Sequence, residues 1–229
     1  MGGFGLPFFF IHLHMAIPTT VDTDTELSAV NSILGAIGQS PVTTLGETSD
    51  GHVTYANPEI AFIYNILTEV NKDVQNEGWI FNTEYNVEKQ PENTTKYITI
   101  PANVLRYDVH GDFHDGSKNI VRRNGRLYDT LADDPKDEFD NNLFLDITWL
   151  WAYEDLPSAF KRYIISRASV RAATQLVSNP QLVQLLQQQE ALTRATCIEY
   201  ECNQGDHSYM GIPLGSSYKS YQPYQALYR

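Results

Sequence analysis

The chain has 229 residues, of which 42% are hydrophobic and 12% aromatic, and its formal net charge is −12. This composition excludes general disorder, and a chain of this length buries about 70% of its unfolded surface without needing a disulfide or a metal. The acidic excess disfavours sequence-independent binding to duplex DNA, because such binding needs Lys and Arg to displace counterions from the phosphates. Length alone is compatible with one large domain or two smaller ones.

The first residues, Met1–Ile17, are apolar and resemble the core of a signal peptide, but they lack a basic start and a small-residue cleavage site. They are too short to cross a bilayer, and no other stretch is long and apolar enough, so we expect no membrane anchoring. Three interpretations stay open: an upstream translation start with Met15 as the alternative first residue, an arm that packs on a neighbouring subunit, and an export signal. We treat residues 1–23 as an N-terminal arm or upstream extension, with no assigned role for residues 1–14.

Apolar residues at helical spacing predict two helices in residues 24–78. The first runs from Asp24 to Ile37, with a capping box formed by Thr23 and Glu26. The second begins at Asn57–Pro58, an N-cap followed by proline at the first helical position, and ends at Gly78. The Thr-, Gly- and Ser-rich segment between them is predicted to be a loop. The apolar face of the second helix is broad enough to indicate burial against more than one neighbour, and includes Ile60, Phe62, Ile63, Ile66, Leu67, Val70 and Val74.

The pattern changes to strands and turns in residues 79–154. Asn124-Gly125 is the strongest hairpin signal, because a type I′ turn needs positive φ at both central positions. The acid-rich segment Asp129–Asp146 is predicted to be a solvated loop before the last strand. We therefore expect an antiparallel, β-sandwich-like insertion, with strands at Tyr97–Ile100, Val104–Val109, Asn119–Arg123, Arg126–Asp129 and Leu143–Trp149.

A second helical hairpin is predicted for residues 155–203, with one helix at Pro157–Val177 and another starting at Asn179-Pro180. The last helix has only a weak apolar stripe, because Leu182 and Leu186 are followed by Gln189 and Thr193. Residues 204–229 form a Tyr-, Ser- and Gly-rich tail without helical or strand periodicity. The fold class is thus α+β: a bundle of about four helices with an inserted antiparallel, β-sandwich-like subdomain.

The two cysteines, Cys197 and Cys202, lie on this last predicted helix. Five helical residues advance about 7.5 Å along the axis, beyond the roughly 7 Å that a disulfide spans between Cα atoms. We expect both thiols to be free unless the helix ends between them.

The sequence contains only weak candidates for a catalytic or metal site. One segment interleaves acids and histidines as a metal site does, namely Asp108, His110, Asp112, His114 and Asp115. Gly111 and Gly116 lie in the same segment and favour a plain turn there. Asp146 and Glu154 form the one carboxylate pair that would suit a glycoside hydrolase. Nucleophile elbows, phosphate-binding loops and dinucleotide fingerprints are lacking from the sequence. We therefore predict a protein that is not an enzyme, with no catalytic, cofactor or metal residues.

Two other groups of residues have structural interpretations. The basic residues Arg122, Arg123 and Arg126 cluster at the predicted Asn-Gly hairpin and are too few for a DNA-reading surface, so they contact an acidic patch on a partner or stay solvated. Trp79 and Phe81 are predicted to anchor the join between the second helix and the β insertion.

Three stretches together resemble the tail tubular protein A family, the tail adaptors or gatekeepers of short-tailed bacteriophages (podoviruses). They are Glu26–Leu45 (ELSAVNSILGAIGQSPVTTL), Glu77–Glu84 (EGWIFNTE) and Asp155–Ser169 (DLPSAFKRYIISRAS), supported by the later Glu199–Glu201 (EYE). The resemblance covers roughly residues 25–204. The first fourteen residues and the Tyr-rich tail depart from the family pattern.

The resemblance implies a head-to-tail connector of the virion: a homo-oligomeric, dodecameric ring below the portal protein. It also implies contacts with the nozzle protein (tail tubular protein B) and the tail fibres, passage of genomic DNA through the lumen during ejection, and synthesis in the cytoplasm of a bacterial host. Two alternatives are a tail-associated polysaccharide hydrolase using Asp146 and Glu154, and a portal plug that binds no fibres.

Overall fold

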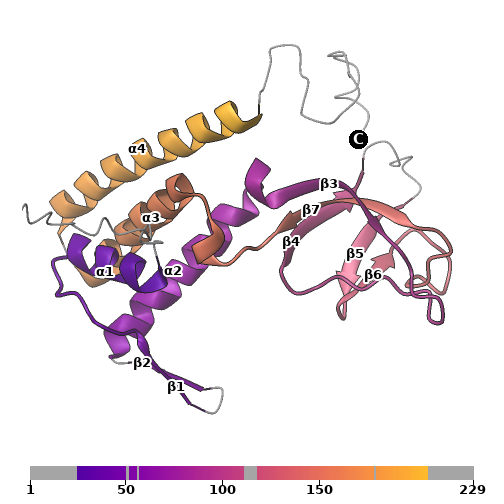
Figure 1. Ribbon diagram of the computed structural model, residues 1–229, viewed down its shortest axis with the longest axis horizontal. Coiled ribbons are helices and arrows are strands. Elements are labelled where there is room, and N and C mark those ends of the chain that lie inside the picture. The colour runs from indigo at the N-terminus through magenta and orange to yellow at the C-terminus, as the bar shows by residue number, and fades with distance from the viewer. Residues whose placement is uncertain (1–24, 50–51, 56, 111–117, 178, 206–229) are drawn as a thin grey trace, which may run out of the picture.

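The computed structural model describes residues 25–49, 52–55, 57–110, 118–177 and 179–205. The four helices gather at one end of the molecule and most strands at the other (Figure 1). Helices α1 (Glu26–Ala36) and α2 (Pro58–Asn76) precede the large β region, and α3 (Ser158–Leu176) and α4 (Pro180–Gly205) follow it. This order confirms the predicted α+β fold, whereas the five-part domain division stays a prediction.

The predicted starts of α2 and α4 are confirmed by side-chain caps. Asn57 accepts a hydrogen bond from the backbone N–H of Glu59 at 3.2 Å. Asn179 accepts two, from the N–H groups of Gln181 at 3.1 Å and Leu182 at 3.3 Å. In both helices proline then occupies the first helical position, where no N–H is needed.

The predicted start of α1 is wrong by two residues. The helix begins at Glu26 rather than Asp24, and its N-cap is Thr25, which accepts from the N–H of Ser28 at 3.3 Å. Because Glu26 is the first helical residue, it cannot be the third residue of a capping box, and the predicted partner Thr23 lies outside the described residues.

Helices α1, α2 and α3 enclose one hydrophobic core, and α4 packs on α3. The broad apolar face of α2 does pack against more than one neighbour, as predicted. It is not surplus surface, however, because within the single chain α1 and α3 cover all of its apolar stripe except Phe62, which is 38% exposed. The face of α2 therefore needs no further copy of the chain to be covered.

The second core lies in the β region. Strands β3 (Thr83–Lys89), β7 (Leu143–Trp149) and β4 (Val104–Val109) form an antiparallel sheet in that order. The hairpin of β5 (Ile120–Arg123) and β6 (Arg126–Asp129) covers it through Leu127, which shares a core with Leu145 and Ile147. Asn124 and Gly125 have φ of 50° and 77°, as the predicted type I′ turn requires.

The structure differs from the strand predictions in three segments. Tyr97–Ile100 is not a strand: Thr99 forms an isolated bridge with Arg126, while the carbonyl of Ile98 accepts from the N–H of Leu127. Strand β3 was not predicted, because TEYNVEK is largely exposed at the sheet edge. The predicted loop before α2 contains a hairpin, β1 (Gly46–Ser49) and β2 (His52–Tyr55), whose strands pair with each other alone.

Candidate functional site

The helical part and the β region are joined by two buried amide side chains. The Nε2 group of Gln75 donates to the carbonyl of Trp151 at 3.0 Å, and the N–H of Trp151 donates back to Oε1 at 2.8 Å. The Nδ2 group of Asn82 donates to the carbonyls of Gln75 and Trp149, both at 2.9 Å. Because these polar groups are buried and satisfied by one another, they fix the end of β7 against the end of α2.

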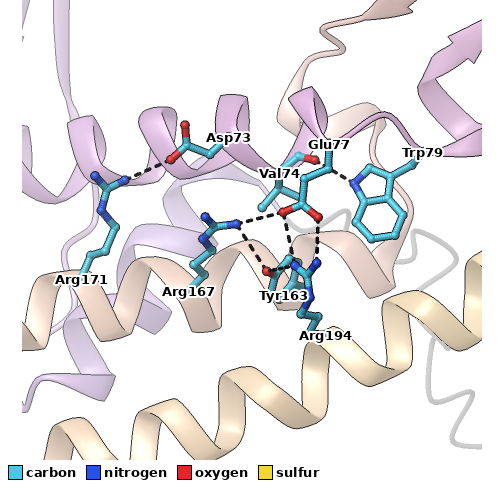
Figure 2. Close-up of polar contacts among 8 residues, drawn as sticks. All are labelled: Asp73, Val74, Glu77, Trp79, Tyr163, Arg167, Arg171 and Arg194. Atoms are coloured by element: carbon cyan, nitrogen blue, oxygen red, sulfur yellow. Dashed lines mark hydrogen bonds and ion pairs between the residues drawn. The ribbon is translucent and has the colours of Figure 1, made fainter. Parts of the chain in front are cut away.

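Aromatic side chains pack directly beside this joint. Phe160 of α3 lies 4.9 Å from Trp79 and 4.6 Å from Phe81, measured between ring centroids. Tyr200 of α4 meets Phe160 edge-on at 5.8 Å. The indole N–H of Trp79 donates to the carbonyl of Val74 at 2.7 Å (Figure 2). The structure thus places Trp79 and Phe81 at the join between α2 and the β region, where the sequence predicted them.

Helix α4 also holds the short helical turn η1 (Ile80–Asn82) by a carboxylate, since Glu201 accepts from the N–H of Ile80 at 2.8 Å. The motifs EGWIFNTE, DLPSAFKRYIISRAS and EYE, far apart in the chain, therefore meet at one place. Their residues stabilise the relative positions of α2, α3, α4 and the β region.

A polar cluster continues this contact along the helices (Figure 2). Glu77, just after α2, pairs with Arg167 of α3 at 3.1 Å and with Arg194 of α4 at 3.2 Å. Both guanidinium groups also donate to the hydroxyl of buried Tyr163, at 3.4 Å from Arg167 and 2.6 Å from Arg194. Hydrogen bonds from Arg194 to Glu77 and Tyr163 raise the pKa of Arg194, so its charge is permanent. One carboxylate and one hydroxyl thereby link three helices.

A further ion pair lies one turn along α3 from Arg167. Arg171 faces Glu69 at 3.3 Å and Asp73 at 3.5 Å, both on α2. Sequence reasoning missed the cluster residues Gln75, Asn82, Glu77 and Arg194. The motif around Glu77 pointed to this region, but nothing in the sequence around Arg194 marks it as a partner of α2.

Only Asp108 and His110 of the predicted metal-like cluster are among the residues that the structure describes. Asp112, His114 and Asp115 lie outside the described residues. Asp108 and His110 are on or just after β4, and Nδ1 of His110 lies 2.6 Å from the carboxylate of Asp146. Among the described residues, no group of three His, Cys, Asp or Glu side chains could hold a metal ion.

The structure does not bring the carboxylate pair together in one cavity. Asp146 lies within β7, opposite Asp108 of β4, and accepts from the backbone N–H of Asn86 at 2.9 Å. It lines a cavity of about 360 Å³ whose lining does not include Glu154. Glu154 lies instead in the turn η2 (Tyr153–Asp155), where its carbonyl accepts from Lys161 at the start of α3. This arrangement gives no support to paired-carboxylate hydrolysis.

Two leucines on the outer side of α4 are left uncovered in the described part of the chain. Leu185 is 63% exposed and Leu192 is 72% exposed. They are seven residues apart and so lie on one side of the helix, with Gln188 and Gln189 between them. Within the part of the chain that the structure describes, no helix is long and apolar enough to span a membrane.

Comparison with known protein families identifies the family of the chain. The profile of the family described as Tail tubular protein matches residues 27–207, well over half of the chain and almost all of the described core. No curated protein sequence matched the chain. The chain therefore belongs to the tail tubular protein family, and it is a structural component of the tail of a short-tailed bacteriophage.

Proposed function

We propose that the protein is the tail adaptor, a ring of identical subunits between the portal protein and the nozzle protein. In this proposal the ring also offers the attachment points for the tail fibres and encloses the conduit through which DNA leaves the head. The protein has no enzymatic role in it. Family membership supports a structural tail role, and the exposed side of α4 supports self-association.

The observation that carries the proposal is the uncovered pair Leu185 and Leu192 on α4. Exposed leucines seven residues apart form the kind of seam that helices use to pack against one another. The flanking side chains at this seam are glutamines and small residues rather than charges, so covering it buries no charge, and the amides require hydrogen-bond partners in the contact. We infer that a neighbouring subunit covers this side of α4 in the ring.

A ring needs a heterologous contact, in which one surface of a subunit meets a different surface of the next. The outer side of α4 can supply one half of such a contact, because α4 lies at the edge of the helical part in Figure 1. The net charge of −12 supports the conduit role, since an acidic wall repels the phosphate backbone and lets DNA pass without binding. A ring whose inner surface is predominantly basic would contradict the conduit proposal.

The self-association step is tested by replacing both leucines with glutamate (Leu185→Glu and Leu192→Glu). The matched control replaces Gln184 and Gln187 with glutamate, which adds the same charge to exposed positions of the same helix away from the line of the two leucines, without removing apolar surface. The mass of each purified chain is measured in solution, alone and with portal protein. We expect rings from the wild type and the control, and monomers from the leucine variant.

Co-purification tests the position in the tail. An adaptor binds both portal and nozzle protein, whereas a plug binds portal alone.

Two outcomes of the mass measurement would contradict self-association. Rings that form unchanged in the leucine variant would show that α4 is not the subunit contact, and a wild-type chain that stays monomeric with portal protein would contradict the ring itself.

A further inference from the structure

The tip of the β5–β6 hairpin carries three arginines, and aromatic rings hold two of them, Arg123 and Arg126. The guanidinium carbon of Arg126 lies 4.0 Å from the ring centroid of Tyr97, and that of Arg123 lies 4.3 Å from the ring centroid of Tyr128. Stacking on an aromatic face holds the plane of a guanidinium while leaving its N–H groups at the edge available to an acceptor. The tip is therefore organised to receive an anionic group.

These arginines differ from the arginines of the helical part. Arg167, Arg171 and Arg194 each face a carboxylate within 3.5 Å. In the described part of the chain, Arg122 and Arg123 have no carboxylate within ion-pair distance, and Arg126 has only Asp137 at 3.8 Å. The positive charge of the tip is thus largely unneutralised, in a protein with a net charge of −12.

A cavity of about 320 Å³ opens between the two stacked guanidinium groups, lined by Arg123, Asn124, Arg126, Leu127, Tyr128 and Asp137. Its size suits one or two carboxylate side chains rather than a duplex. Three arginines are also too few to hold nucleic acid on an acidic protein, because each phosphate contact must outweigh the repulsion from the remaining surface. The chemistry of the tip therefore favours an acidic protein segment over DNA.

The same hairpin carries an acidic pair at its other end. Strand β6 leads away from the turn to Asp129, whose N–H donates to the carbonyl of Lys136 at 2.8 Å, and this bond closes the loop that contains Asp133 and Asp134. Both aspartates are exposed, and strand β6, about 10 Å from Arg126 to Asp129, leads from the tip to the loop that carries them. The hairpin thus has a basic end and an acidic end.

We propose that the β5–β6 tip of one subunit docks against the loop with Asp133 and Asp134 of the next subunit. This inference rests on the proposed ring, and it assigns to the β regions a second, electrostatic contact besides α4. Opposite ends of one hairpin suit a head-to-tail contact that repeats around a ring. Copies of so acidic a chain repel one another, and a complementary charge contact offsets this repulsion while fixing the register of the subunits.

Charge reversal in the full-length chain tests the contact. The tip variant carries Arg122→Glu and Arg123→Glu, and the loop variant carries Asp133→Lys and Asp134→Lys; all four side chains are exposed, so folding should not change. The matched control, Lys72→Glu with Arg162→Glu, makes the same charge change as the tip variant at exposed positions of α2 and α3. Circular dichroism verifies the fold, and mass measurements at low ionic strength report ring assembly.

We expect the tip and loop variants alone to assemble about tenfold more weakly than the wild type, because like charges then meet at every contact. An equimolar mixture of the two should assemble again, since each tip then finds a loop of opposite charge, and so should a chain that carries all four substitutions. The control should assemble like the wild type.

The inference is overturned if the tip variant assembles normally, or if two folded variants fail to restore assembly in the mixture. Binding of the tip to an acidic segment of another protein would give the second outcome. A wild-type chain that never forms rings would instead contradict the proposed function, and with it this contact. Normal rings from both charge variants would contradict this contact alone.

Discussion

Gln75 and Trp151 exchange two hydrogen bonds across the junction between the helices and the β region, from the Gln75 amide to the Trp151 carbonyl and from the Trp151 N–H back to the amide oxygen. The residues are 76 positions apart, and Gln75 is completely buried. Such a side chain holds the backbone of a distant segment as a paired strand would. In a tail subunit, this junction fixes how the β region is oriented relative to the helices.

Replacing Gln75 with leucine should lower the free energy of unfolding by about 1 to 3 kcal/mol, because the N–H and the carbonyl of Trp151 lose the partner that the buried Gln75 amide supplies. Chemical denaturation measures the loss. The adjacent control Asn76→Leu changes an exposed amide and should cost less than about 0.5 kcal/mol. Equal effects of the two substitutions would contradict the role of Gln75 in the junction.

Tyr163 should contribute through its hydroxyl to the attachment of α4. Tyr163→Phe removes the acceptor shared by Arg167 and Arg194, and we expect a loss of about 1 to 2 kcal/mol of unfolding free energy. Amide hydrogen exchange should accelerate most in α4. Tyr85→Phe is the matched control, because that ring is 66% exposed, and it should leave both measurements unchanged. Unaltered exchange in α4 of the Tyr163 variant would argue against the polar cluster as a helix clamp.

The unfolding free energy should fall at alkaline pH through Tyr64. Burial, the hydrogen bond to Glu26 and the charge of that carboxylate raise the pKa of Tyr64 from 10.0 to about 12. Because the folded state holds this proton more tightly than the unfolded state, the associated stability is complete below pH 10 and is lost as the pH rises to 12. The ring is only partly buried, so we expect about 1 kcal/mol after solvent screening.

The measurement is the difference in unfolding free energy between the wild type and Tyr64→Phe at neutral pH and between pH 10 and 12. This difference should shrink in the alkaline range, since the variant has no proton to lose at this position. A difference that is constant over the whole range would show that Tyr64 ionises equally in both states.

The two cysteines should differ in reactivity. Cys202 is exposed, whereas Cys197 is buried with its Sγ 3.3 Å from the carbonyl of Ala159 on α3. Burial raises the pKa of the Cys197 thiol to about 11, against 9.0 ordinarily, so its thiolate is about 100-fold rarer at a given pH. A thiol reagent should modify one cysteine in the folded chain and two in denaturant, and Cys202→Ser should remove the fast reaction. Rapid labelling of Cys197 would mean that α4 does not pack on α3 as described.

Sequence alone determined the elements whose signals are local. The caps Asn57 and Asn179, the prolines that follow them and the Asn124-Gly125 turn depend only on neighbouring backbone groups, and the structure has them where the sequence predicted. Strands β4, β6 and β7 were predicted with their observed bounds, because one face of each carries apolar residues for the β core. The combination of short motifs likewise sufficed for the family.

Tertiary structure decided everything that depends on partners far along the chain. Strand β3 is a strand because β7 lies beside it, although its own residues are largely polar. Glu77 and Arg194 are 117 residues apart, so no periodicity relates them. The broad apolar face of α2 predicted several neighbours without saying which; α1 and α3 of the same chain cover it, and the uncovered leucines lie on α4. The spacing of apolar residues along a helix predicts that one face will be buried, but the packing of the folded chain decides which neighbour buries it.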